Sequence, residues 1–224
     1  MAVFCSKQIV VPVRDKILSD YAEGEIVKLN ENGSPVEFYV AKHDYESDLN
    51  GSGRTLLVRK DCYTTSVAWS GYYNTYSSSI IDKWLTGTYR AVLDAAVQTA
   101  IDNTKFYCAY GNGSSTIQTL EKPVFILSVA EFGFTPYDDS YVDGSVLPIA
   151  NSLKVAYYNG SSVDQWTRSP YVSYGSDSGA NFITKSGTRS MYTSFNGTGT
   201  VGTRPCFTLP GNTLFDHSTN LFKG

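Results

Sequence analysis

The sequence predicts an α+β fold in which two helices pack on a twisted antiparallel sheet, followed by a long, loop-rich C-terminal region. Three observations support this prediction. Short runs of alternating apolar and polar residues are separated by Gly- and Asn-containing turns, which is typical of antiparallel strands. Strong apolar periodicity at helical spacing occurs only between residues 79 and 102. Tyr, Ser, Thr, Gly and Asn dominate residues 157–207.

The first strands form a hairpin. Residues 25–29 and 36–41 alternate between apolar and polar side chains, and Asn32-Gly33 lies between them. Asn-Gly favours the tight turn that joins two antiparallel strands. Residues 56–60 predict a further strand after a Gly-rich loop.

Two helices are expected in the middle of the chain. Ser79 is placed to cap a helix over residues 80–86, with Asp82 in its first turn and Gly87 at its end. A second helix is expected over residues 89–102, because its apolar residues fall on one face. These are Tyr89, Leu93, Ala96, Val97, Ala100 and Ile101.

Three segments follow the helices. Residues 111–115 are expected to form a loop, and the continuous apolar run at 123–128 predicts a buried strand. Residues 136–149 contain acidic and aromatic residues without periodicity, so a loop is expected.

The C-terminal region contains a second hairpin. Residues 180–185 and 188–194 flank Ser186-Gly187, and residues 204–209 predict a returning strand in the main sheet. Because side chains alternate along a strand, only one face of this hairpin is expected to belong to the core.

Composition excludes several classes of partner. The net charge is −3 and Lys and Arg do not cluster, which argues against nucleic acid, because phosphate binding needs a basic surface. No apolar run approaches the length that spans a bilayer, so no membrane insertion is expected. The start of the chain does not resemble a secretory signal, because its apolar run is short and contains Pro12.

The expected domain organisation is an N-terminal segment over residues 1–22 and one main domain over residues 23–224. The first segment has two interpretations. It is either a linker or attachment segment that contacts other virion proteins, or simply the first strand of the main domain.

Catalytic and metal-binding patterns are not found in the sequence. Cys5, Cys62, Cys108 and Cys206 are far apart, as are His43 and His217, so no cofactor, transition metal or nucleophile–base pair is expected. Buried free thiols are expected instead. A glycosidase needs two paired carboxylates, and no pair stands out among the acidic candidates. Those candidates are Glu131, Asp138, Asp139 and Asp143. The three aspartates predict a solvated acidic loop rather than a calcium site.

Five motifs occur in a fixed order, at residues 56–63, 79–89, 124–131, 165–170 and 202–207. Their order resembles a family of uncharacterised domains from gut Firmicutes and their phages. In that family a Leu-Leu-Arg-Lys-Asp strand, a Lys-Trp-Leu helix, a Trp-Leu-Arg-Ser-Pro motif and an Arg-Pro strand follow one another. Gln165 and Thr167 depart from the third motif, and Cys206 stands where the family usually has Ala.

The resemblance implies a C-type-lectin-like fold, near the variable proteins of diversity-generating retroelements. In such proteins the stretch before the last strand binds ligand, which here corresponds to about residues 170–201. The residues proposed to bind ligand are Tyr171, Tyr174, Asp177, Asn181, Arg189, Tyr192, Phe195 and Asn196. Tyr supplies a large contact area with one polar tip, which suits recognition. Trp166, Arg168 and Arg204 are expected to hold the fold.

The expected function is therefore non-enzymatic recognition of a host cell-surface protein or glycan by a protein on the surface of a phage particle. A homo-oligomer is compatible with this function. Two alternatives remain, a structural virion component that binds only other virion proteins, and a lectin on a bacterial cell surface.

Overall fold

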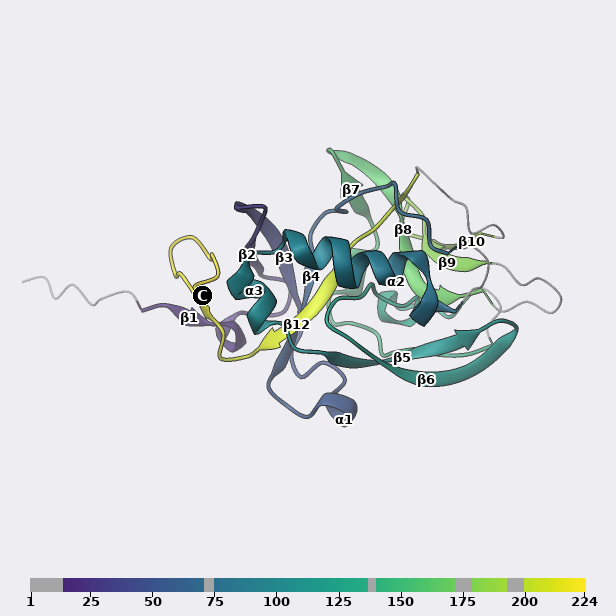
Figure 1. Ribbon diagram of the computed structural model, residues 1–224, viewed down its shortest axis with the longest axis horizontal. Coiled ribbons are helices and arrows are strands. Elements are labelled where there is room, and N and C mark those ends of the chain that lie inside the picture. Colours follow the sequence, from purple (N-terminus) through teal and green to yellow (C-terminus); the bar gives the residue numbers. More distant parts are fainter. Residues whose placement is uncertain (1–13, 71–74, 137–139, 172–178, 193–199) are drawn as a thin grey trace, which may run out of the picture.

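The computed structural model describes residues 14–70, 75–136, 140–171, 179–192 and 200–224 (Figure 1). It is mostly β, with 40% strand and 19% helix. Within the described ranges, only the helical segment at residues 80–92 reaches seven residues. The predicted α+β, C-type-lectin-like fold is therefore wrong, because several antiparallel sheets rather than a pair of long helices organise the chain.

The central sheet has the strand order β12-β4-β3-β2 and is antiparallel throughout. Its strands are β2 (Ile26–Glu31), β3 (Ser34–Lys42), β4 (Arg54–Arg59) and β12 (Cys206–Pro210). The predicted first hairpin is confirmed, with Asn32 and Gly33 at φ values of 50° and 74° in its turn. The predicted returning strand is confirmed as well, since β12 pairs with β4.

The second sheet has the order β10-β9-β8-β11, with β7 also paired to β8. It comprises β7 (Ala156–Tyr158), β8 (Ser161–Pro170), β9 (Ala180–Ile183), β10 (Arg189–Tyr192) and β11 (Val201–Gly202). Strands β9 and β10 confirm the predicted second hairpin. All four side chains of β9 are buried, so the expectation that only one of its faces belongs to the core is wrong.

A third pairing was not predicted. β5 (Thr104–Gly111) and β6 (Ser114–Lys122) form a long hairpin around Asn112-Gly113, where only a loop was expected. It runs along one side of the molecule (Figure 1). In the apolar run at 123–128, residues 124–128 are buried as predicted, but the run is not a strand. It contributes one isolated bridge between Phe125 and Cys206.

The helical segment departs from the predicted pair of helices. Ser79 caps α2 (Ile80–Trp84) as expected, accepting a hydrogen bond from the Asp82 N–H at 3.1 Å. The helix does not end at Gly87 but continues through the π-helical η3 (Leu85–Tyr89) and the 3-10 turn η4 (Arg90–Val92).

Leu93 interrupts the second predicted helix. Its backbone is extended, it forms a bridge to Glu31 of β2, and the Asp94 N–H donates to the Asn30 carbonyl. This contact with β2 replaces a helical turn, so that only α3 (Ala95–Ala100) follows.

Smaller elements complete the fold. They are β1 (Lys16–Ile17), η1 (Leu18–Asp20), α1 (Ser47–Asn50), η2 (Tyr76–Ser78), η5 (Ala130–Phe132), α4 (Ala150–Leu153) and β13 (Leu214–Phe215). β1 pairs with β13, and Leu18 and Tyr21 are buried, so residues 16–21 pack on the main domain. Residues 1–13 lie outside the described residues, and the domain boundary at residue 22 remains a prediction. No helix in the described ranges has the length and apolarity needed to cross a membrane.

Gly202 provides a test of the packing between β11 and the segment that follows β4. A Cβ atom there would collide with Cys62 Sγ and approach the Asp164 carbonyl oxygen at 3.1 Å. We expect Gly202→Ala to lower the free energy of unfolding by about 1–3 kcal/mol, the usual cost of overpacking. Chemical denaturation measures the loss. Adding Cys62→Ala to Gly202→Ala should recover part of it, and no recovery would contradict the proposed clash.

Candidate functional site

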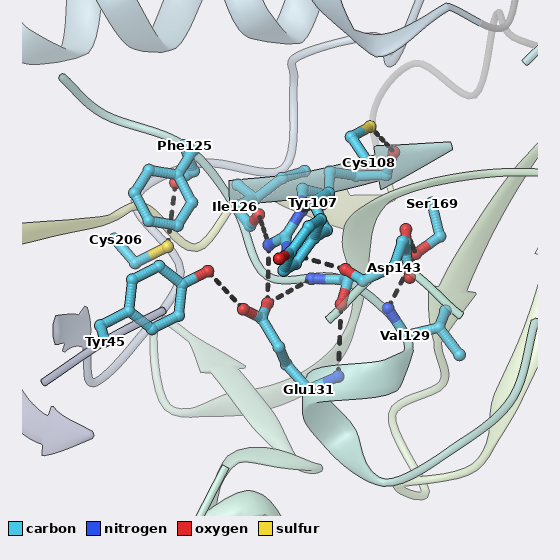
Figure 2. Close-up of polar contacts among 12 residues, drawn as sticks. Tyr45, Tyr107, Cys108, Phe125, Ile126, Val129, Glu131, Asp143, Ser169 and Cys206 are labelled. Carbon is cyan, nitrogen blue, oxygen red and sulfur yellow. Dashed lines mark hydrogen bonds and ion pairs between the residues drawn. The ribbon is translucent and has the colours of Figure 1, made fainter. Parts of the chain in front are cut away.

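A fully buried ion pair lies at the centre of the molecule. Arg168 of β8 and Glu131 of η5 have no exposed side-chain surface, and their charged groups are 2.6 Å apart (Figure 2). The Tyr45 hydroxyl donates to Glu131 at 2.5 Å, and the Ser128 N–H donates to the same carboxylate at 2.7 Å. Each Glu131 oxygen therefore has a donor, which a buried charge requires.

The remaining N–H groups of Arg168 bind main-chain carbonyls from three other segments. They donate to the carbonyls of Tyr107, Ile126 and Asp143 at 3.0, 3.1 and 3.0 Å. The guanidinium also lies over the Phe106 ring. One side chain thus fixes β5, the 123–128 segment and the 140–149 loop to β8, and the predicted structural role of Arg168 is confirmed.

Asp143 extends this network toward the end of β8. The Ser169 hydroxyl donates to Asp143 Oδ2 at 2.7 Å and accepts a bond from the Val129 N–H at 2.9 Å. Burial raises the pKa of Asp143 to about 6, although the Arg168 charge and the Ser169 hydrogen bond act in the opposite direction. Asp143 Oδ1 has no hydrogen-bond partner among the described residues. We call Glu131, Asp143, Arg168 and Ser169 the buried frame.

Arg204 forms a second anchor. It donates to the carbonyls of Arg59, Lys60 and Leu153 at 2.7, 2.6 and 2.8 Å, which confirms its predicted structural role. Trp166 is buried and donates to the Val67 carbonyl at 3.2 Å.

The frame holds a loop with two exposed apolar side chains. Tyr141, Asp143 and Leu147 are buried, whereas Val142 and Val146 are 60% and 61% exposed. The prediction of a solvated acidic loop is therefore wrong for Asp143. Asp138 and Asp139 lie outside the described residues.

The structure separates the residues proposed to bind ligand. Asn181 is completely buried, and its amide donates to the Pro170 carbonyl at 3.0 Å. Tyr192 is half-buried against the rings of Trp166 and Phe182. Arg189 is half-buried and donates to the carbonyls of Thr135 and Pro136. Tyr174, Asp177, Phe195 and Asn196 lie outside the described residues.

Tyr171, Gly179 and Tyr192 meet where β8 ends, β9 begins and β10 ends. The Tyr171 N–H donates to the Gly179 carbonyl at 3.0 Å. A Cβ atom on Gly179 would lie 2.5 Å from the Tyr192 carbonyl oxygen and 3.0 Å from Tyr171 Cβ. Close approach therefore requires glycine here. We call Tyr171, Gly179, Arg189 and Tyr192 the β9–β10 surface.

The described cysteine side chains and His43 serve the fold. Burial raises the pKa of Cys62 to about 12 and also raises the pKa of Cys108 and Cys206. These thiols stay protonated at neutral pH and are poor nucleophiles. Both ring nitrogens of His43 bind the fold, at Thr55 Oγ1 and the Tyr21 carbonyl. No group of three or more potential metal ligands occurs in the part of the chain that the structure describes.

A family described as Domain of unknown function (DUF6273) matches residues 52–211. This chain belongs to the DUF6273 family. The matched region of this DUF6273 protein contains the whole buried frame, Arg204 and all five sequence motifs, and it runs from the loop before β4 to the end of β12. Neither the comparison with curated proteins nor that with solved structures found a match.

Proposed function

We propose that this DUF6273 protein is a non-enzymatic binding module that presents the β9–β10 surface to a ligand. Its proposed partner is a protein or glycan on a host cell, and its proposed place is the surface of a phage particle. The observation that carries the proposal is the convergence of Tyr171, Gly179 and Tyr192 beside the end of β8, the strand that carries Arg168 and Ser169 of the buried frame. A rigid support beneath polar and aromatic side chains is how binding surfaces are commonly built.

The layout of the molecule supports this orientation. β1 and the C-terminus lie at one end of the long axis, and β9 and β10 lie toward the other (Figure 1). An attachment near β1 would therefore leave the β9–β10 surface accessible. The frame itself is enclosed, because Glu131, Asp143 and Arg168 are fully buried, so its carboxylates support the surface and do not meet a substrate.

Tyr171→Ala tests the proposal. Labelled full-length protein is applied to a glycan array and to intact gut Firmicute cells, and saturable binding is expected. Removing the Tyr171 ring should weaken that binding by about 30-fold, because aromatic anchors often contribute about 2 kcal/mol.

Tyr157→Ala is the matched control. This tyrosine is 46% exposed and lies in β7, beside the opposite end of β8, so binding should not change. Binding that survives Tyr171→Ala unchanged would overturn the assignment of the surface. Binding to virion proteins alone would favour the structural alternative.

A further inference from the structure

Strand β6 has an open edge. It pairs with β5 on one side, and no described residue pairs with its other side. Most of its side chains are exposed or half-buried. The outer edge of β5 differs, because the Asn50 amide bonds both main-chain groups of Lys105, at 2.8 and 2.9 Å, and Arg168 bonds the Tyr107 carbonyl. One edge of the hairpin is therefore closed by side chains, whereas no described residue pairs with the other.

The contacts on β5 show which groups face the open edge. The main-chain groups of Lys105 and Tyr107 point away from β6. In an antiparallel pair, the main-chain groups of successive residues point alternately toward the partner strand and away from it. The main-chain groups of Phe106 and Cys108 therefore face β6 and bond to those of Leu120 and Gln118. The neighbouring residues of β6 then turn their N–H and carbonyl groups outward. These are Ile117, Thr119 and Glu121.

The usual protections of an edge strand are weak here. Edge strands commonly avoid pairing by being short, by carrying Pro, or by placing charges along the strand. β6 has nine residues and no Pro, and its only charged residues, Glu121 and Lys122, lie together at its C-terminal end. Ile117 is 36% exposed near the middle.

We propose that two copies of this chain associate by pairing their β6 strands antiparallel, about a two-fold axis at Gln118. Ile117 of one copy then lies opposite Thr119 of the other, and the two residues exchange main-chain hydrogen bonds. The outward-facing main-chain groups of Ile117 and Thr119 are used, and these two β-branched side chains meet on the exposed face, a favourable cross-strand pair.

Charge and hydrogen bonding favour a second copy over a charged peptide. In this register Lys122 lies opposite Ser114, and the two Lys122 side chains are roughly 27 Å apart at 3.4 Å per residue. No like charges therefore face each other. Gln118 Nε2 is buried and has no hydrogen-bond partner among the described residues. With a side-chain rotation, the two Gln118 amides can bond each other across the axis.

Sedimentation velocity of the full chain tests the association. A single strand pair is a small interface, so a dissociation constant between about 1 μM and about 1 mM is expected. The average mass should rise from 24.6 kDa toward twice that value as concentration increases to about 1 mM. Ile117→Lys combined with Thr119→Lys should keep the chain monomeric by placing like charges opposite each other. Ile80→Lys, at a 46% exposed helical position, should not change the association.

A charge pair tests the register. Ile117→Lys and Thr119→Glu are made in separate chains and mixed. The mixture should associate more tightly than either variant alone, because the introduced lysine of one chain would lie opposite the introduced glutamate of the other. A wild-type chain that stays monomeric at the highest concentration would overturn the proposal. So would unchanged dimerisation of the double-lysine variant, or a mixture no heavier than its components.

Discussion

Replacing Arg168 by Met is expected to lower the free energy of unfolding by about 3–5 kcal/mol. The substitution leaves the Glu131 carboxylate buried without its counter-charge, and it removes donors from three main-chain carbonyls. Guanidinium chloride denaturation followed by circular dichroism measures the change. Adding Glu131→Gln should restore part of the loss, because the uncompensated charge is then gone.

Arg54→Met is the matched control for Arg168→Met. Arg54 also forms an ion pair, with Asp102 at 3.2 Å, but the side chains are 25% and 57% exposed. Exposed pairs contribute little, so the loss should stay below about 1 kcal/mol. Equal losses for Arg54→Met and Arg168→Met would show that the buried frame is not a special source of stability.

The second large effect is a pH dependence that originates at Asp143. Its pKa is raised from an ordinary value of 3.8 to about 6, so the folded state holds this proton more tightly than the unfolded state. The contribution of this bound proton to the free energy of unfolding is fully present below pH 3.8 and is lost as pH rises to about 6. At about 1.4 kcal/mol per pH unit, the loss amounts to about 3 kcal/mol.

Asp143→Asn isolates this contribution. The amide oxygen can still accept the Ser169 hydrogen bond. Burying the new amide N–H groups can lower the free energy of unfolding, but this loss does not depend on pH. The variant should therefore gain about 3 kcal/mol relative to wild type between about pH 4 and pH 7. Denaturation curves of both proteins across this range give the difference between their free energies of unfolding at each pH. The contributions of the other titrating groups are common to both proteins and cancel in this difference. A difference that stays constant with pH would refute the assignment.

Local turn chemistry made several elements predictable from the sequence. Asn32-Gly33 and Ser186-Gly187 each specify a turn between two apolar runs, and both hairpins are present. The β5–β6 hairpin also turns at an Asn-Gly pair, at Asn112-Gly113. Its strands were missed because β6 is mostly polar, so the alternation expected of a half-buried strand is absent there.

The fold class could not be predicted because tertiary contacts override the helical pattern. Tyr89, Leu93 and Val97 have helical spacing and are all buried as expected. Leu93 nevertheless adopts an extended backbone and pairs with Glu31, and the Asp94 side chain accepts a bond from Asn30 at 2.8 Å. Periodicity identifies the buried positions, but it cannot show that a neighbouring strand competes for the backbone.

The candidate site was only partly predictable for a related reason. Arg168 and Arg204 stand next to Pro-containing motifs, which indicated a structural role for both. Asp143 gave no such signal, because its partners Ser169 and Arg168 lie 26 and 25 residues away. Asn181 looked like a surface amide in a polar segment, yet it is fully buried and its amide donates to the Pro170 carbonyl.

The pairing of β4 with β12 has a consequence for the newly synthesised chain. Leu57 of β4 and its partner Phe207 of the edge strand β12 are both fully buried. A chain that is still being translated carries β2, β3 and β4 long before β12 leaves the ribosome. During that interval the edge of β4 that pairs with β12 has no native neighbour, and the domain can complete its core only after β12 has emerged. Until β12 emerges, the domain should therefore be sensitive to chaperones that shield apolar strands.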